Sequence, residues 1–121
     1  MRIGADYYPE HWEKERWKTD AEMMVKANIK VIRIGEFAWS LYEPEEGKYE
    51  FDWMDEALDF FGKYGIKVVM CTPSATPPKW MIDKYPDILQ NDIHGNPKLF
   101  GTRKHYCFNS QTYREKTKKL N

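Results

Sequence analysis

The stretch Val31-Ile-Arg-Ile-Gly-Glu-Phe-Ala-Trp39 joins a strand-like run to a charged and aromatic cluster. Three of its first four residues are β-branched and apolar, which is typical of a buried strand covered on both faces. Gly35 ends the run, and Glu36 follows it among large aromatic side chains. Ligands of parallel α/β proteins bind beyond the carboxyl ends of the strands, because loops there can vary without disturbing the core. The cluster therefore indicates binding, and a carboxylate among aromatic rings suits a sugar.

Strand-like and helix-like segments alternate on both sides of this stretch. Strands are predicted at residues 2–5, 30–34 and 66–71. A first helix is predicted from an apolar stripe at helical spacing, which consists of Trp17, Ala21, Met24 and Val25. A second helix is expected to start at Asp52 as its N-cap and to stop at Gly65, which suits a left-handed turn.

The second half of the chain is less regular. Pro77-Pro78 can open a short helix, because proline is tolerated in a first turn. Residues 85–109 contain repeated proline and glycine and are predicted to form a long loop, which compact domains rarely keep unless it is functional. A final helix is expected over residues 112–120, with Asn109 and Ser110 as its caps.

This order of elements predicts an α/β fold with parallel strands and crossover helices. Three strands alone make a poor parallel sheet, because both faces need cover and the edges need protection. A (β/α)₈ TIM barrel needs eight such units and about 250 residues. We therefore interpret residues 1–121 as the N-terminal portion of such a barrel, about three βα units, which stops before the fourth strand.

Composition excludes several classes of partner. The 19 basic and 19 acidic residues balance, so no electrostatic attraction favours nucleic acid or an anionic membrane. No apolar stretch is long enough to span a bilayer, and Met1 leads directly into a strand-like segment rather than a signal peptide. The two cysteines, Cys71 and Cys107, are then expected to be reduced thiols in a cytoplasmic protein.

Five motifs together resemble glycoside hydrolase family 42, the microbial β-galactosidases built on a TIM barrel. They occur in order at residues 5–12 (ADYYPEHW), 33–39 (RIGEFAW), 43–47 (EPEEG), 72–78 (TPSATPP) and 103–110 (RKHYCFNS). The resemblance implies a retaining hydrolase of terminal non-reducing β-D-galactosides. It further implies a cytoplasmic homotrimer with domains after the barrel and no organic cofactor.

Retaining glycosidases need two carboxylates about 5–5.5 Å apart, one as nucleophile and one as acid/base. In the family both are glutamates, at the ends of the fourth and seventh barrel strands. The sequence stops before either strand, so we assign no catalytic residue to this chain. The 121-residue chain alone is accordingly expected to be inactive.

Two residues of the last motif match family positions with assigned roles. Arg103 matches the arginine that hydrogen-bonds the galactose, and a guanidinium offers several fixed donors to sugar hydroxyls. Cys107 matches the first cysteine of a four-cysteine zinc site found in many members. Structural zinc normally takes four ligands, so the chain alone is expected to hold no zinc, whereas the full-length protein can.

Three charged residues at strand ends are further substrate-binding candidates. Arg33 either lies near the nucleophile, as a matching arginine does in related retaining barrels, or forms a structural ion pair with Glu36 or Asp6. Glu36 is expected to support or bind the substrate rather than to catalyse. Asp6 follows the first strand together with Tyr7, Tyr8 and His11, and any of these can line a pocket.

The remaining features have simpler interpretations. Trp39 and Tyr7 can equally belong to the core, and Cys71 is expected to be a small buried apolar residue. The acidic run 43–50 is expected to be a solvated loop, and the basic positions 116, 118 and 119 the outer face of a helix. Two other functions stay open: a non-catalytic fragment that binds sugar weakly or serves as scaffold, and a related glycosidase with another sugar specificity.

Overall fold

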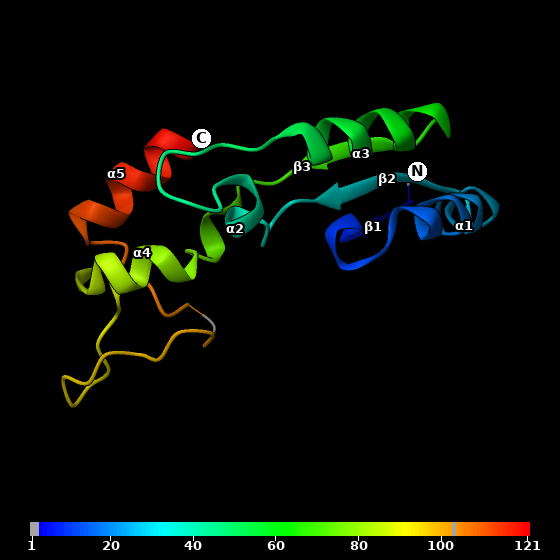
Figure 1. Ribbon diagram of the computed structural model, residues 1–121. Coiled ribbons are helices and arrows are strands. Elements are labelled where there is room, and N and C mark those ends of the chain that lie inside the picture. Colours follow the sequence, from blue (N-terminus) through cyan, green and yellow to red (C-terminus); the bar gives the residue numbers. More distant parts are fainter. Residues whose placement is uncertain (1–2, 103) are drawn as a thin grey trace.

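The computed structural model describes residues 3–102 and 104–121. Its strands and longer helices alternate along the chain as β1 (Ile3–Asp6), α1 (Lys14–Lys26), β2 (Ile29–Ile34), α3 (Asp52–Lys63), β3 (Lys67–Met70), α4 (Lys79–Lys84) and α5 (Gln111–Leu120). Four shorter elements lie between them: η1 (Pro9–His11), α2 (Trp39–Tyr42), η2 (Pro73–Ala75) and η3 (Pro86–Ile88). Figure 1 shows the strands and their two long helices at one end and the remaining helices at the other.

The three strands form one parallel sheet in the order β1-β2-β3, which confirms the predicted α/β arrangement. In the register of the sheet, Asp6 pairs with Arg33, and Arg33 pairs with Val69. Ile32 and Ile34 of β2 are fully buried, whereas Arg33 between them is exposed. The expectation that β2 is covered on both faces is therefore wrong for the described residues, because only one face of the sheet is packed.

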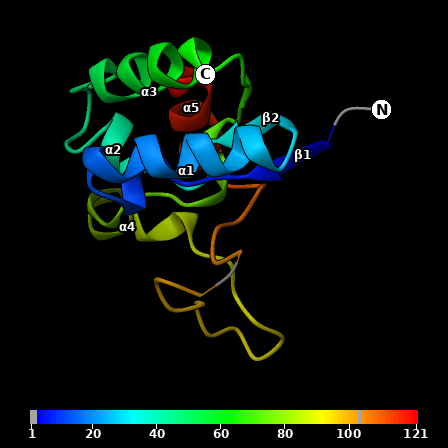
Figure 2. The same cartoon turned by 90° about the vertical axis from the view of Figure 1, so that its right-hand side faces the viewer.

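Helices α1 and α3 cover that packed face. Their buried residues form one cluster with Ile32 and Ile34 of β2, and the members from α1 and α3 are Trp17, Ala21, Met24, Met54, Ala57 and Phe61. Trp17 packs against Phe61 with ring centroids 6.2 Å apart. Figure 2 shows α1 lying in front of β2 and α3 above it. The predicted stripe of α1 is confirmed except at Val25, which is 42% exposed at the margin of the apolar face.

The helix ends agree with the sequence in part. Gly65 adopts φ +69° directly after α3, which confirms the predicted left-handed stop. Phe51, not Asp52, is the N-cap of α3, so Asp52 lies in the first turn, where its charge favours the helix dipole. Ser110 caps α5 by accepting a hydrogen bond from the Tyr113 amide at 3.2 Å.

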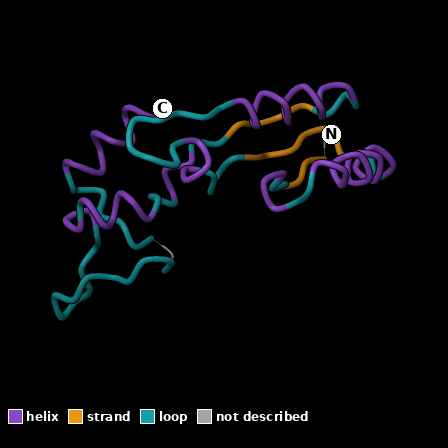
Figure 3. Tube along the Cα trace, viewed as in Figure 1, coloured by secondary structure: helices purple, strands orange, loops and turns teal. Residues whose placement is uncertain are grey.

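A second core lies beyond the carboxyl ends of the strands, where α2, α4, η3 and α5 meet. Its buried members are Trp39, Met81, Ile82, Ile88, Tyr106 and Tyr113. The predicted loop 85–109 leaves this core as an extended arm, visible at the lower left of Figure 3. Isolated antiparallel bridges between Leu89 and Tyr106 and between Asn91 and Pro97 hold the two sides of the arm together.

Glu43 ties α2 to the second core. Its carboxylate accepts hydrogen bonds from the Trp39 indole at 2.9 Å and the Gly47 amide at 2.8 Å. Its backbone carbonyl accepts from the Trp80 indole at 2.8 Å. Glu43 is only 2% exposed, so the expectation of a solvated loop is wrong at this position. A buried carboxylate satisfied by several donors can hold a loop in one conformation.

Glu46 links the same loop to α4 and α5. Its carboxylate forms ion pairs with Lys84 and Lys116 and accepts a hydrogen bond from the Tyr85 hydroxyl at 2.9 Å. The hydrogen bonds to Lys116, Lys84 and Tyr85 lower the pKa of Glu46 from 4.5 to about 2. The Lys116 side chain is only 15% exposed, so the interpretation of positions 116, 118 and 119 as the outer face of a helix is wrong for Lys116.

Within residues 3–102 and 104–121, no helix combines the length and apolar character needed to cross a bilayer.

We expect Glu43→Gln to destabilise the protein by about 1–3 kcal/mol, because an amide NH₂ would then face the Trp39 indole or the Gly47 amide. Glu50→Gln, at an exposed position of the same loop, is the control and should change the unfolding free energy by about 0.5 kcal/mol or less. Urea unfolding of the protein that carries each substitution measures both values. Equal effects of the two substitutions would contradict the assigned role of Glu43.

The lowered pKa of Glu46 predicts a dependence of stability on pH. Ionised Glu46 stabilises the fold fully above about pH 4.5, and this stabilisation is lost as the pH falls toward about 2. Unfolding of the wild type and Glu46→Gln should therefore differ at neutral pH and converge in acid. Glu22→Gln, an exposed position of α1, is the control. A difference that persists at about pH 2 would refute the ion-pair explanation.

Candidate functional site

Three of the predicted substrate-binding residues meet at the carboxyl ends of β1 and β2. Arg33 donates from Nε to Asp6 Oδ1 at 2.9 Å and from Nη2 to Asp6 Oδ2 at 3.2 Å. Its Nη2 also donates to Glu36 Oε2 at 2.7 Å. The structure thus shows the ion-pair alternative for Arg33, with both proposed partners at once. A position of Arg33 near a nucleophile stays a prediction.

The strand geometry explains this Asp6–Arg33–Glu36 cluster. Asp6 and Arg33 are paired neighbours on the open face of the sheet. Gly35 then turns the chain with φ +83°, and an added Cβ would lie 2.6 Å from the Tyr42 hydroxyl, so only glycine fits. This turn places Glu36 beside the guanidinium, three residues after Arg33.

The electrostatics of the cluster favour binding over bond cleavage. Two carboxylates and one guanidinium leave one net negative charge, and the hydrogen bond to Asp6 raises the pKa of Arg33. The side chains stay 28–53% exposed, so a ligand can reach them. Both carboxylates are held as acceptors by one cation, an arrangement that suits sugar hydroxyls. A retaining pair instead needs one carboxyl as acid and one as unencumbered nucleophile.

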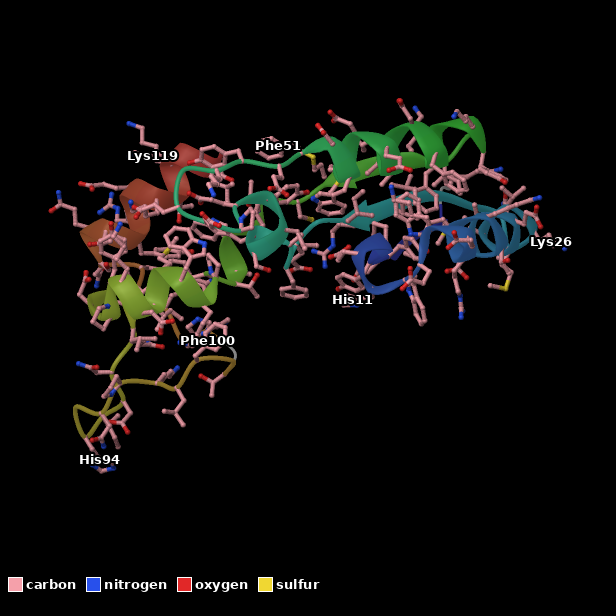
Figure 4. All side chains as sticks on the ribbon, viewed as in Figure 1. His11, Lys26, Phe51, His94, Phe100 and Lys119 are labelled. Carbon is pink, nitrogen blue, oxygen red and sulfur yellow. The ribbon has the colours of Figure 1, made fainter. Side chains whose placement is uncertain are left out.

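Aromatic side chains extend the site along one side of the cluster. Tyr8, after β1, stacks on Phe37, after β2, with ring centroids 5.8 Å apart and planes at 22°. Tyr8 also stacks on His11 at 5.2 Å and 20°. We call Phe37, Tyr8 and His11 the aromatic stack. Figure 4 labels His11, near the sheet, and Phe100, at the base of the arm.

The other two aromatic candidates belong to the core. Trp39 is fully buried in the second core. Tyr7 is 8% exposed and donates a hydrogen bond from its hydroxyl to the buried Asp20 at 2.9 Å. Burial and the hydrogen bond to Asp20 raise the pKa of the Tyr7 hydroxyl. Burial thus supports the core interpretation of both rings, although Tyr7 also borders a hollow that Asp6 and Trp12 line.

A cavity of about 830 Å³ opens next to the cluster. The β2–α2 turn, the segment that leads into α4 and the base of the arm enclose it. Its lining includes Glu36, Phe37, Pro77, Lys79, Phe100 and Tyr106. The volume falls in the range of small-molecule sites, about 300–1,000 Å³. The sequence did not identify Phe100 or Lys79 as cavity residues. For Phe100, the only indication was the length of the predicted loop 85–109 that contains it, and for Lys79 it was the proline pair Pro77-Pro78 directly before it.

Arg103 lies outside the described residues, so its predicted contact with galactose stays a prediction. The residues on either side of it line the cavity: Gly101, Thr102, Lys104 and His105. His105 is 4% exposed, and its Nδ1 lies 2.8 Å from the Thr102 carbonyl oxygen. This contact joins His105 to Thr102 at the edge of the cavity.

The cysteines do not form a metal centre within the described chain. Cys71 and Cys107 are half-buried free thiols, so the expectation of a buried Cys71 is only partly met. Burial raises the pKa of the Cys71 thiol. In the part of the chain that the structure describes, no three His, Cys, Asp or Glu side chains gather as a metal site. Cys107 can supply one zinc ligand at most, and one thiolate does not hold a structural zinc ion.

Comparisons with known proteins agree with this geometry. A family model described as beta-galactosidase, that of glycoside hydrolase family 42, matches residues 6–121. The chain is 50% identical over 120 residues to a β-galactosidase of Haloferax lucentense, and 53% identical over 118 residues to one of Thermus thermophilus. These matches cover 99% and 98% of this chain but only 18% of each relative.

Solved structures show the same relation. A β-galactosidase from Halorubrum lacusprofundi superposes with a TM-score of 0.94 at 47% identity, and one from Bacillus circulans with 0.95 at 36%. Each superposition covers 99% of this chain and 18% of the solved chain. The chain thus has the fold of a portion of the TIM barrel of these enzymes, as its sequence predicted. By sequence and by structure, the chain belongs to glycoside hydrolase family 42, the β-galactosidase family.

Proposed function

We propose that this chain forms the N-terminal part of the barrel of a β-galactosidase and contributes to the binding of a β-galactoside. The Asp6–Arg33–Glu36 cluster carries the proposal, because it places charged hydrogen-bonding groups at the carboxyl ends of two parallel strands, beside an open cavity. Membership of the family supports the choice of substrate.

In this proposal the chain binds and orients the sugar, and groups outside the chain cleave it. Arg33 fixes the positions of both carboxylates, and their remaining lone pairs accept hydrogen bonds from sugar hydroxyls. Two further carboxyl groups would hydrolyse the terminal β-D-galactoside with retention, through a covalent galactosyl intermediate. Arg103 would add hydrogen-bond donors to the galactose.

A second candidate function is a barrel fragment that binds sugar weakly or serves as scaffold. The shared guanidinium favours it for the 121-residue chain alone, because neither Asp6 nor Glu36 is placed as an acid or a nucleophile. A different sugar specificity is a third candidate. Comparing hydrolysis of β-galactosides, β-glucosides and α-arabinosides by the full-length protein separates it from the first.

We further propose several properties that the family resemblance implies. The full-length protein would be a cytoplasmic homotrimer that acts on galactosides or oligosaccharides and needs no organic cofactor. Cys107 would donate one thiolate to a structural zinc site whose other ligands lie outside this chain. No partner in nucleic acid or membrane is proposed, because charge is balanced over the sequence.

Because the proposed cleaving groups lie outside the chain, the chain and the full-length protein are expected to differ in activity. The full-length protein should hydrolyse a chromogenic β-galactoside, whereas the isolated 121-residue chain should show no turnover above background. Hydrolysis by the isolated chain at enzyme-like rates, abolished by Glu36→Gln, would show that the cleaving groups lie within these residues after all. Absence of activity in the full-length protein would favour the scaffold function.

Arg33→Lys in the full-length protein should lower kcat/KM for a β-galactoside by about tenfold or more, since a lysine cannot hold two carboxylates in a fixed fork. Thermal stability should change little, because exposed ion pairs contribute about 0–1 kcal/mol. Arg114→Lys, on the exposed side of α5, is the matched control and should leave kcat/KM unchanged. Equal kinetics for the two variants would remove Arg33 from the proposed site.

A further inference from the structure

We propose that Tyr42 and Glu10 are positioning residues for substrate binding: a buried water joins the Tyr42 hydroxyl to the Glu10 carboxylate, and this pair holds the β2–α2 turn that places Glu36. The inference rests on the proposed function, which assigns Glu36 to substrate binding. It adds two residues that lie outside both the charged cluster and the lining of the 830 Å³ cavity. Both act on the substrate only through the turn.

The Tyr42 hydroxyl lies directly against this turn. Tyr42 is the last residue of α2 and is only 3% exposed. A Cβ added at Gly35 would lie 2.6 Å from the Tyr42 hydroxyl oxygen, so this oxygen touches the backbone one residue before Glu36. The rings of Phe51 and Trp53 lie 5.4 and 5.2 Å from the Tyr42 ring, measured between centroids. These rings fix the position of the hydroxyl beside Gly35.

Tyr42 and Glu10 both carry buried polar atoms that need partners. Among the described residues, neither the Tyr42 hydroxyl nor either carboxylate oxygen of Glu10 has a hydrogen-bond partner, although all three atoms are buried. Buried polar groups almost always have such a partner, which is often an ordered water. A phenol can donate and an ionised carboxylate can only accept, so one water between them satisfies both.

The contacts around the two groups bring them to the same place. Glu10 lies in η1 after β1, and the turn follows β2, which is the parallel neighbour of β1. Tyr8, two residues before Glu10, stacks on Phe37, two residues after Gly35, with centroids 5.8 Å apart. Burial and the nearby negative charge of Glu10 both raise the pKa of the Tyr42 hydroxyl, which agrees with this proximity.

The position of the turn controls the position of Glu36. Gly35 has φ +83°, and this bend brings Glu36 Oε2 to 2.7 Å from Arg33 Nη2. Without the Tyr42 hydroxyl, the backbone at Gly35 loses a neighbour on its buried side, and Glu36 is no longer held in one place. A displacement of a binding group by about 1 Å can lower the rate of an enzyme by about 100-fold.

The test is a pair of double-mutant cycles in the full-length protein, with hydrolysis of a β-galactoside as the readout. Tyr42→Phe removes only the hydroxyl and should lower kcat/KM by about fivefold or more. In the Glu36→Gln variant, the same substitution should lower kcat/KM by less than about twofold, because the hydroxyl acts through Glu36. Glu10→Gln should also lower kcat/KM, and Tyr42→Phe added to Glu10→Gln should cost less than about twofold more.

Tyr64→Phe is the matched control. Tyr64 is a partly buried tyrosine that packs on the core of α1, α3 and β2, directly after the last residue of α3. It lies outside the turn, so kcat/KM should stay unchanged. Thermal unfolding shows whether each variant is folded at the assay temperature.

Three outcomes would overturn the inference: an unchanged kcat/KM in Tyr42→Phe, an equal fold loss with and without Glu36→Gln, or unfolding of Tyr42→Phe at the assay temperature. The last two would show that Tyr42 only stabilises the fold. Failure of the proposed function has a different result. Glu36→Gln alone would then leave kcat/KM unchanged, and the inference would fail with it.

Discussion

Burial of one face of β2 is the constraint on which the site depends. Ile32 and Ile34 are fully covered by α1 and α3, so the alternation of a strand sends Arg33 to the opposite face. Parallel pairing with β1 then brings Asp6 next to Arg33 in register. The charged cluster is thus a consequence of the apolar core: a shift of β2 by one residue would bury the guanidinium and expose both isoleucines.

The second core positions the walls of the cavity, as the first core positions the charged cluster. Trp39 is fully buried there, and Glu43 joins its indole to the loop that follows α2. The Trp80 indole donates to the Glu43 backbone carbonyl, which ties the start of α4 to the same loop. Tyr106 at the base of the arm stacks on Tyr113 of α5 with centroids 4.7 Å apart. The loops that line the cavity are therefore fixed by buried contacts behind them, and fixed loops of this kind are what precise ligand binding requires.

The sequence predicted the parts of the fold that follow from local pattern. Hydrophobic periodicity located three strands and the long helices. The residue types at the strand ends identified Asp6, Arg33 and Glu36 as candidates for substrate binding. The sequence did not predict the burial of Glu43 or Lys116, because Trp80 and Glu46, which contact them, are distant in the sequence and become neighbours only through tertiary folding. Composition alone does not show whether the carboxylates of an acidic run such as residues 43–50 are solvated or accept hydrogen bonds from buried donors. The pairing within the arm likewise depends on contacts that no local period shows.

The sheet of this chain is open on the face that carries the proposed binding groups. Val69 of β3, which pairs with Arg33 on this face, is 51% exposed, although parallel strands are usually covered on both faces. The solved relatives superpose on this chain with only 18% of their own length, so most of each relative lies outside the matched part. In a closed barrel every strand end faces one common centre, and reacting groups come from several strands. The side chains of Asp6, Arg33 and Glu36 would then complete a site that no three strands can form alone.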